Sequence, residues 1–331
     1  MLPPARPWAG RGQRAGPTFS AIWFFAFPER LQVQFDWWIE VLRSRRIDLV
    51  IADFAPVSML AARAFGIPSV CVGTGYSAPP PGMTSFPILL PEYTTLVHDE
   101  AALLANTNAI LAPFNLEPLG AFSDIYRASV SMPRTIRQLD PYDGLRASPL
   151  LPPLNEAVPR GTGSGDEIFV YFSTAETAYA PPGRGLCGLD LPVRAYLPGA
   201  DAQLLDRLVQ AGVMVELAPV PVDQIAARSR LMLNAGQHGS LCMGLGLGIP
   251  QLTLPQHLEH LYHARRAFDL GVAEIVPYRS WDAGQIIALT RELYFDPDRA
   301  ARSQALAASL YPDLFGDIAR LVRDRVGPLL D

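Results

Sequence analysis

Short apolar runs that alternate with segments of helical periodicity constrain this chain more than any other feature. Runs such as 48–52 (DLVIA) and 168–172 (IFVYF) are almost continuously apolar, which is typical of strands buried on both faces of a parallel sheet. Between such runs, apolar residues recur at helical spacing, as in 35–46 and 202–210. A stretch rich in Pro and Gly, residues 146–166, separates two of these alternating series. The pattern predicts an α/β protein with two Rossmann-like, doubly wound domains.

The alternation also predicts where the domains and their elements lie. We expect a disordered N-terminus over 1–18, a first domain over 19–149, a linker over 150–166 and a second domain over 167–331 that ends in helices. Residues 178–192 interrupt the rhythm with Pro and Gly where the alternation calls for a helix. The predicted strands are 48–52, 68–72, 168–172, 193–197, 213–217, 230–234, 251–254 and 272–276, and the predicted helices are 35–46, 59–65, 100–111, 202–210, 222–228 and 257–270.

Composition excludes several classes of protein. Hydrophobic residues make up 49% of the 331 residues and the formal net charge is −5, so we expect a buried core and no nucleic-acid partner. The three cysteines, Cys71, Cys187 and Cys242, lack the spacing of a zinc or redox motif, which favours a reducing, cytoplasmic setting. No apolar run is long enough for a transmembrane segment. The segment 19–27 (FSAIWFFAF) follows several arginines, as in a signal peptide, but it lacks a small-residue cleavage site.

A turn of small residues after the predicted strand 230–234 favours an anion site. Ser240 follows this turn and opens a predicted helix, whose first backbone N–H groups have no partner within the helix. Farther along, Glu259 and His260 begin another helix that also follows a strand. A hydrogen-bond acceptor beside a donor suits the paired hydroxyls of a sugar ring. Together these segments predict a site for a phosphorylated sugar derivative.

Residues 234–260 resemble the sugar-nucleotide signature of the UDP-glycosyltransferase-like GT-B glycosyltransferases. That signature is His-x-Gly-x-x-Ser/Thr, then Gly-Val/Ile-Pro, then Pro, three residues and Asp/Glu-Gln. Anchored on residues 248–250 (GIP), it fits without a gap: Ser240 takes the hydroxyl that contacts the diphosphate, and Glu259-His260 takes the pair that holds sugar hydroxyls. The resemblance implies a nucleotide-sugar site made of Asn234, Gly236, His238, Gly239, Ser240, Leu241, Glu259 and His260.

The chain departs from this signature at several positions. Ala235 stands where the family usually has a phosphate-contacting His, and Met243 stands where many members have a Glu that holds the ribose. His260 replaces a Gln, so we expect the charge at this position to vary with pH.

The N-terminal half resembles the same family around Asp53, in the segment VIADFAP. In the family, an Asp in this context orients a general-base His that is carried by an earlier Gly-rich turn. No histidine precedes His98 here, and the first convincing strand begins at Asp48. The resemblance therefore implies an N-terminally shortened member, with an incomplete N-terminal domain and Asp53 as a relay carboxylate without its base.

The resemblance implies transfer of a hexose from a UDP-sugar to a hydroxyl of a small or lipophilic acceptor, with no metal or other cofactor. A catalytically impaired GT-B subunit that binds a nucleotide-sugar or a partner protein is the alternative, and a nucleotide-sugar epimerase is a weaker third reading.

The single residues also have structural readings. Ser240 could be a helix N-cap, Glu259-His260 a solvated pair, and Asp53 a cap of the following helix. His257, His260 and His263 invite a metal reading, but on a helix they spread too widely to converge.

Overall fold

The computed structural model describes residues 24–92, 98–155, 159–161, 163, 165–173 and 175–330. These residues form two compact units: unit 1 contains the described residues up to Leu151 and those from Ile318 onward, and unit 2 contains Pro152–Asp317. The segment 1–18, predicted to be disordered, lies outside the described residues. Each unit is built around a parallel sheet.

Unit 2 is a doubly wound sheet with strand order β6-β5-β4-β7-β8-β9, and every pairing in it is parallel. The chain starts in the middle of the sheet, moves to one edge, returns to the middle and moves to the other edge, which is the Rossmann order. The strands are β4 (Glu167–Tyr171), β5 (Val193–Tyr196), β6 (Met214–Glu216), β7 (Ser229–Asn234), β8 (Gln251–Thr253) and β9 (Ala273–Ile275). The helices are α5 (Ala180–Cys187), α6 (Ala202–Gln210), α7 (Val222–Arg228), α8 (His238–Leu247), α9 (Leu258–Asp269), α10 (Ala283–Tyr294) and α11 (Pro297–Leu314).

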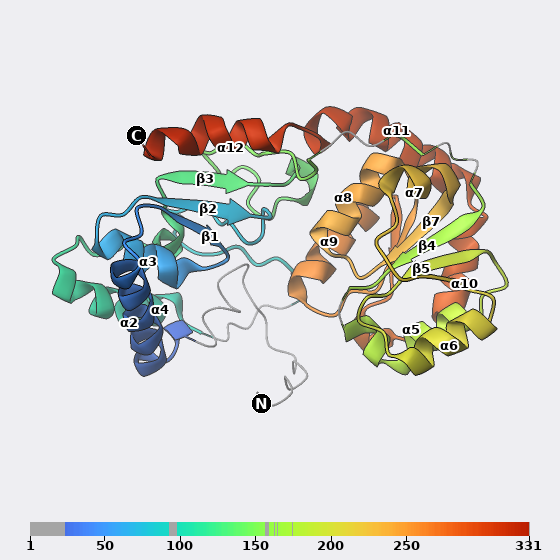
Figure 1. The fold of residues 1–331 in the computed structure, drawn as a ribbon, viewed down its shortest axis with the longest axis horizontal. Helices are drawn as coiled ribbons and strands as arrows, with labels where there is room; N and C mark the ends of the chain where they lie inside the picture. The colour runs from blue at the N-terminus through green and yellow to red at the C-terminus, as the bar shows by residue number, and fades with distance from the viewer. Residues whose placement is uncertain are drawn as a thin grey trace. The chain divides into compact units, whose positions relative to one another are not determined.

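Helices cover both faces of this sheet, because alternate side chains of each strand point to opposite faces. Ile168 and Val170 of β4 pack in one core cluster with residues of α5, α6 and α10, whereas Phe169 packs with residues of α7 and α8 on the other face. Figure 1 shows the two helical layers. Strand 168–172 is therefore buried on both faces. The same reading of 48–52 is wrong, because the strand there, β1 (Val50–Asp53), alternates buried and exposed residues, and Ile51 is 60% exposed.

The helix expected between 178 and 192 is present as α5, despite its Pro and Gly content. Two prolines lie in its first turn, where a missing backbone N–H does no harm. Gly183 and Gly185 lie against other helices: a Cβ on them would come within 2.8 Å of Leu204 Cδ1 and 2.9 Å of Ile286 Cγ2. The small residues that break the sequence pattern thus allow close helix packing.

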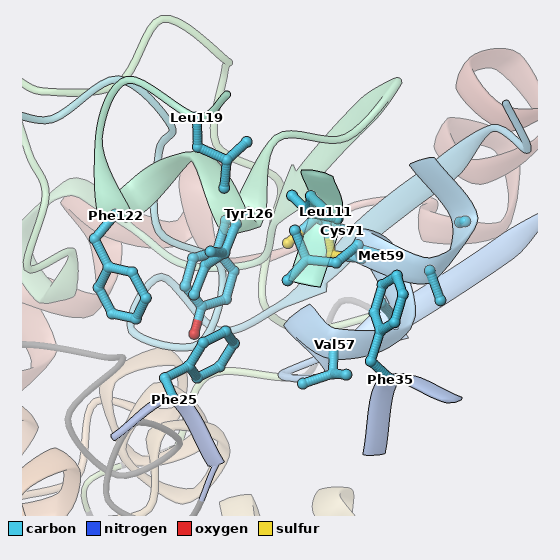
Figure 2. Close-up of a cluster of buried hydrophobic side chains, with 14 of the residues drawn as sticks. Phe25, Phe35, Val57, Met59, Cys71, Leu111, Leu119, Phe122 and Tyr126 are labelled. Atoms are coloured by element: carbon cyan, nitrogen blue, oxygen red, sulfur yellow. The ribbon is translucent and has the colours of Figure 1, made fainter. Parts of the chain in front are cut away.

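Unit 1 contains a parallel sheet of order β1-β2-β3. Its core gathers side chains from the strands and the helices beside them, and Figure 2 shows Phe25, Phe122 and Tyr126 among them. Phe25 and Phe122 meet edge to face with ring centroids 5.3 Å apart. The sequence pattern missed β3, which is short and ends at a proline. The strands are β1 (Val50–Asp53), β2 (Ser69–Gly73) and β3 (Val130–Pro133), and the helices are α2 (Pro28–Ser44), α3 (Pro56–Ala64), α4 (Glu100–Leu111) and α12 (Ile318–Val326).

The chain's last helix corrects the predicted domain boundaries. α12 belongs to unit 1 because Val326 packs in a cluster with Val70, Met132 and Leu151. The second unit therefore ends at Asp317, not at residue 331. The predicted linker is also partly built into unit 2, since the Gly161 N–H donates to the Leu247 carbonyl at 2.8 Å.

Within the described residues, no helix has the length and apolar character needed to cross a bilayer. The three cysteines are free thiols. The cytoplasmic location stays a prediction of the sequence.

Candidate functional site

The strand order of unit 2 reverses between β4 and β7, and ligands of open α/β sheets bind at such a point, beyond the carboxyl ends of the strands. A side-chain hydrogen bond joins the loops that follow these two strands. Gln237 Nε2 donates to Ser173 Oγ at 3.1 Å. The turn between β7 and α8 therefore lies at the switch point, where the signature predicted a ligand.

A buried network of amide groups shapes this turn. Asn234 Oδ1 accepts from the Gly236 N–H at 2.8 Å, and Asn234 Nδ2 donates to Gln251 Oε1 at 2.9 Å. Gln251 Nε2 in turn donates to the Leu241 carbonyl at 3.2 Å, which ties β8 to the first turn of α8. Asn234 and Gln251 are fully buried. Asn234, predicted as a ligand contact, thus holds the turn in shape from inside the sheet.

The first turn of α8 combines amides outside the helical ladder with open space beside Gly239. The first helical hydrogen bond runs from the Leu241 N–H to the Gln237 carbonyl at 2.9 Å, so the amides of His238, Gly239 and Ser240 precede the helical ladder. A Cβ on Gly239 would meet no heavy atom within 4 Å. Amides that precede the helical ladder, with open space beside Gly239, are what an anion requires.

Two predicted roles in this turn are corrected by the structure. The N-cap of α8 is Gln237, so Ser240 is the third residue of the helix and not its cap. Leu241, predicted as part of the ligand site, is a core residue that packs with Ala267 and Ala273. Its N–H is already used in the helix, and its carbonyl accepts from Gln251.

The start of α9 lies against the same turn. Gly236 has φ +81°, and a Cβ on it would come within 2.8 Å of the His260 carbonyl oxygen, so only glycine permits this approach. Glu259 is partly exposed and precedes His260 in the first turn of α9. The structure therefore brings together the two segments that the sequence placed in one site.

The histidines of α8 and α9, His238, His260 and His263, are buried. His238 lies with its ring centroid 5.0 Å from that of His263, and its Nε2 is 3.7 Å from Cys242 Sγ, so its side chain faces α9. Burial, assisted by repulsion from the neighbouring His257, lowers the pKa of His260 to about 3. Burial also holds the pKa of His263 well below its usual range. The predicted pH-dependent charge of His260 is therefore wrong near neutral pH, because burial keeps the ring neutral.

The metal reading of the histidine series gains no support. Among the residues that the structure describes, no group of three or more His, Cys, Asp or Glu side chains could hold a metal ion.

Unit 1 places Asp53 at the carboxyl end of β1. It does not cap the following helix, since the N-cap of α3 is Ala55 and no side chain bonds to the first amides there. Asp53 forms no hydrogen bond or ion pair with another described residue. Asp53 is exposed at the end of the strand, and partial desolvation of its carboxyl group raises the pKa of Asp53. The capping role that the sequence left open is therefore wrong.

The turn after β2, residues 73–78, faces Asp53 and was missed by the sequence reading. A Cβ on Gly73 would come within 2.2 Å of Ser77 Oγ and 2.8 Å of Asp53 Oδ1. A buried ion pair fixes the turn from behind. Arg146 binds both oxygens of Asp140 and also donates to the carbonyls of Gly75 and Ala78, each at 2.6 Å. The signal available in the sequence was a Gly-Thr-Gly triplet directly after the strand 68–72.

Comparisons with known proteins agree with this architecture. The solved structures similar to this chain include the kitacinnamycin glycotransferase, with a TM-score of 0.62, 20% identity and coverage of 94% of this chain and 85% of that one. The calicheamicin glycosyltransferase CalG4 gives a TM-score of 0.64 at 16% identity, covering 88% and 78%. The spinosyn rhamnosyltransferase SpnG gives 0.62 at 15% identity, covering 96% and 86%. The chain has a GT-B fold.

Similarity in sequence covers less of the chain than similarity in structure. No family model matches the chain. The glycosyltransferase GtfC of Amycolatopsis orientalis is 28% identical over 109 residues. The match spans 32% of this chain and 26% of GtfC.

Proposed function

We propose that this protein is a glycosyltransferase that moves a sugar from a nucleoside-diphosphate sugar to a hydroxyl of an acceptor. The observation that carries the proposal is the first turn of α8 at the switch point of unit 2. Its amides precede the helical ladder, open space lies beside Gly239, and the start of α9 packs against the same turn. The GT-B fold and the partial match to GtfC support it.

In the proposed complex, the diphosphate accepts hydrogen bonds from the amides of His238, Gly239 and Ser240 and from the Ser240 hydroxyl. Hydrogen bonds to a charged group contribute about 1.5–3 kcal/mol each, more than the ~0.3–1 kcal/mol of an exposed helix dipole. Glu259 accepts from sugar hydroxyls, and the neutral ring of His260 lies beside it. The same amides stabilise the negative charge that develops on the leaving diphosphate. This scheme assigns no role to a metal ion.

We propose a pyrimidine nucleotide, UDP or dTDP, as the carrier of a hexose or deoxyhexose. The signature around Ser240 is that of UDP-sugar enzymes. Two of the similar structures, however, were solved with thymidine diphosphate: VinC and SpnG. A small, lipophilic acceptor is proposed because SpnG was also solved with the spinosyn aglycone.

Binding and transfer are tested in two steps with the full chain. Calorimetric titration with UDP and dTDP, against uridine and thymidine, should show that a diphosphate binds at least about a hundredfold more tightly than its nucleoside, as two charge-assisted hydrogen bonds require. Addition of EDTA should leave this affinity unchanged. The protein is then incubated with UDP-glucose, dTDP-glucose and dTDP-rhamnose and a set of phenols, with mass spectrometry for new glycosides. If neither diphosphate binds, the proposal is wrong. Binding without any transfer would favour the non-catalytic subunit.

A further inference from the structure

The Gln237 side chain joins the two loops at the switch point of unit 2, and its contacts fix the orientation of its amide. Gln237 Oε1 accepts from the Ala235 N–H at 3.2 Å, and Gln237 Nε2 donates to Ser173 Oγ at 3.1 Å. A backbone N–H can only donate, so the amide oxygen must face Ala235 and the amide nitrogen must face Ser173. The opposite orientation would set two donors against each other at Ala235.

This orientation determines what the Ser173 hydroxyl can do. A serine hydroxyl has one hydrogen to donate and two lone pairs that accept. Because Gln237 donates to Ser173 Oγ, it occupies a lone pair and leaves the hydrogen unused. Within the described residues, the Ser173 side chain makes no other hydrogen bond, and it is only partly buried. The hydrogen can therefore be donated to an acceptor from outside the chain.

A second hydroxyl without a partner lies on the same turn. Ser240 is only 7% exposed, yet its side chain makes no hydrogen bond with any residue that the structure describes. A polar side chain at such depth usually has a partner. Between Gln237 and Ser240 in the chain lie the amides of His238 and Gly239, which precede the helical ladder. Hydrogen-bond donors thus gather at this turn, as a ligand rich in acceptor oxygens requires.

We propose that Gln237 is a positioning residue that turns the Ser173 hydroxyl toward the diphosphate of the nucleotide. The inference rests on the proposed function, which puts the diphosphate at this turn. Gln237 acts through Ser173 and needs no contact of its own with the ligand. Since Ser173 belongs to the loop after β4, the diphosphate is then held from the loops of both strands at the switch point, β4 and β7.

A double-mutant cycle on the binding of UDP or dTDP at pH 8 tests the direction of the hydroxyl. With Gln237 present, S173A should raise the Kd about 10- to 100-fold, as expected for loss of a hydrogen bond to a charged group. Q237E keeps an oxygen for the Ala235 N–H but has no donor, so the Ser173 hydrogen turns to the new carboxylate. In the Q237E background, S173A should therefore change the Kd less than about twofold. Comparison within one background cancels the effect of the added charge.

Two further variants separate the hydroxyl from the shape of the loop. S173T keeps a hydroxyl and should bind the diphosphate within about threefold of the wild type. S309A, at an exposed position of α11, is the control and should bind like the wild type. An unchanged Kd in S173A, or an equal rise in both backgrounds, would overturn the inference while the proposed function stands. A wild type that binds neither diphosphate would overturn both.

Discussion

The carboxyl edges of the two parallel sheets differ in how their polar groups are paired. In unit 2, Asn234, Gln251 and the Gly236 amide satisfy one another, and burial lowers the pKa of the nearby His260 to about 3. In unit 1, a carboxylate stands at the same end of the sheet without a described partner. Fixed dipoles with satisfied neighbours suit the binding of an anion, whereas the Asp53 carboxylate is exposed at its sheet edge. The two sheet edges therefore differ in how their polar groups are compensated.

The side-chain pairs that fix the two turns also differ between the units. A neutral amide pair, Asn234 and Gln251, fixes the turn of unit 2, whereas a buried ion pair, Asp140 and Arg146, fixes the turn of unit 1. A neutral anchor adds no charge of its own beside the proposed diphosphate. The ion pair carries no net charge, so it does not cancel the desolvation that raises the pKa of Asp53.

Breaking the amide anchor of unit 2 should have the largest effect on stability. Q251L leaves the Asn234 amide without its acceptor and the Leu241 carbonyl without its donor, both in a fully buried place. Each unsatisfied group costs about 1–3 kcal/mol, so the free energy of unfolding should fall by roughly 2–5 kcal/mol in urea melts. The control is Q285L, at an exposed position of α10. Equal melting of the two variants would show that the network does not hold the turn.

Stability measurements at low pH test whether the fold of unit 2 keeps His260 neutral. His260 has a pKa of about 3 in the fold and an ordinary value near 6.5 when unfolded, so the unfolded chain binds more protons between these values. The stability that His260 contributes is present above the unfolded pKa and is lost as the pH falls. Between pH 7 and pH 4, the advantage of the wild type over H260Q should shrink by roughly 3 kcal/mol in denaturant melts. A constant difference would mean that His260 is charged in the fold.

Loss of the Ser240 hydroxyl should have a smaller effect than loss of the amide network of Asn234 and Gln251. S240A removes one hydroxyl that donates to the diphosphate and should raise the Kd of UDP or dTDP by about 10- to 100-fold, the equivalent of ~1.5–3 kcal/mol. S309A, at an exposed position of α11, is the control in the same calorimetric titration. Unchanged affinity in S240A would remove the hydroxyl from the proposed site and leave only the backbone amides.

Much of unit 2 could be predicted from the sequence because its elements follow simple periodicity. The bounds of α6 and α7 agree with the prediction, and each strand differs by a residue or two at its ends. The position of Ser240 at a helix start, beside the start of α9, was also predictable, since strand ends and helix starts alternate regularly there. What periodicity could not show is side-chain direction. Asn234 and Leu241 are fully buried, whereas Gly239 in the same motif is exposed.

Unit 1 was harder to predict because its features depend on distant residues. β3 is short and lies more than fifty residues after β2, with which it pairs. Arg146 and Asp140 fall in a stretch that resembles a linker, and only the fold shows that they fix the turn at 73–78. The same holds for α12, whose apolar residues meet β2 and β3 only after the chain has passed through unit 2. Asp53 was found through resemblance, but only the fold shows that it forms no hydrogen bond or ion pair with another described residue.

The smallest expected effect is that of D53N on the melting temperature. Its direction is unusual, because removal of this carboxylate should leave the stability unchanged or raise it slightly. The pKa of Asp53 is raised in the fold, so its charge opposes folding above that pKa, and this penalty disappears as the pH falls and the carboxyl group is protonated. D53N should therefore melt at the same temperature as the wild type or slightly above it near pH 7, and the gap should close in acid. D99N, at the helix cap, should melt like the wild type at every pH, because asparagine caps as well as aspartate. Destabilisation by D53N in differential scanning calorimetry would mean that the carboxylate has a structural partner, and Asp53 would then resemble the satisfied groups of unit 2.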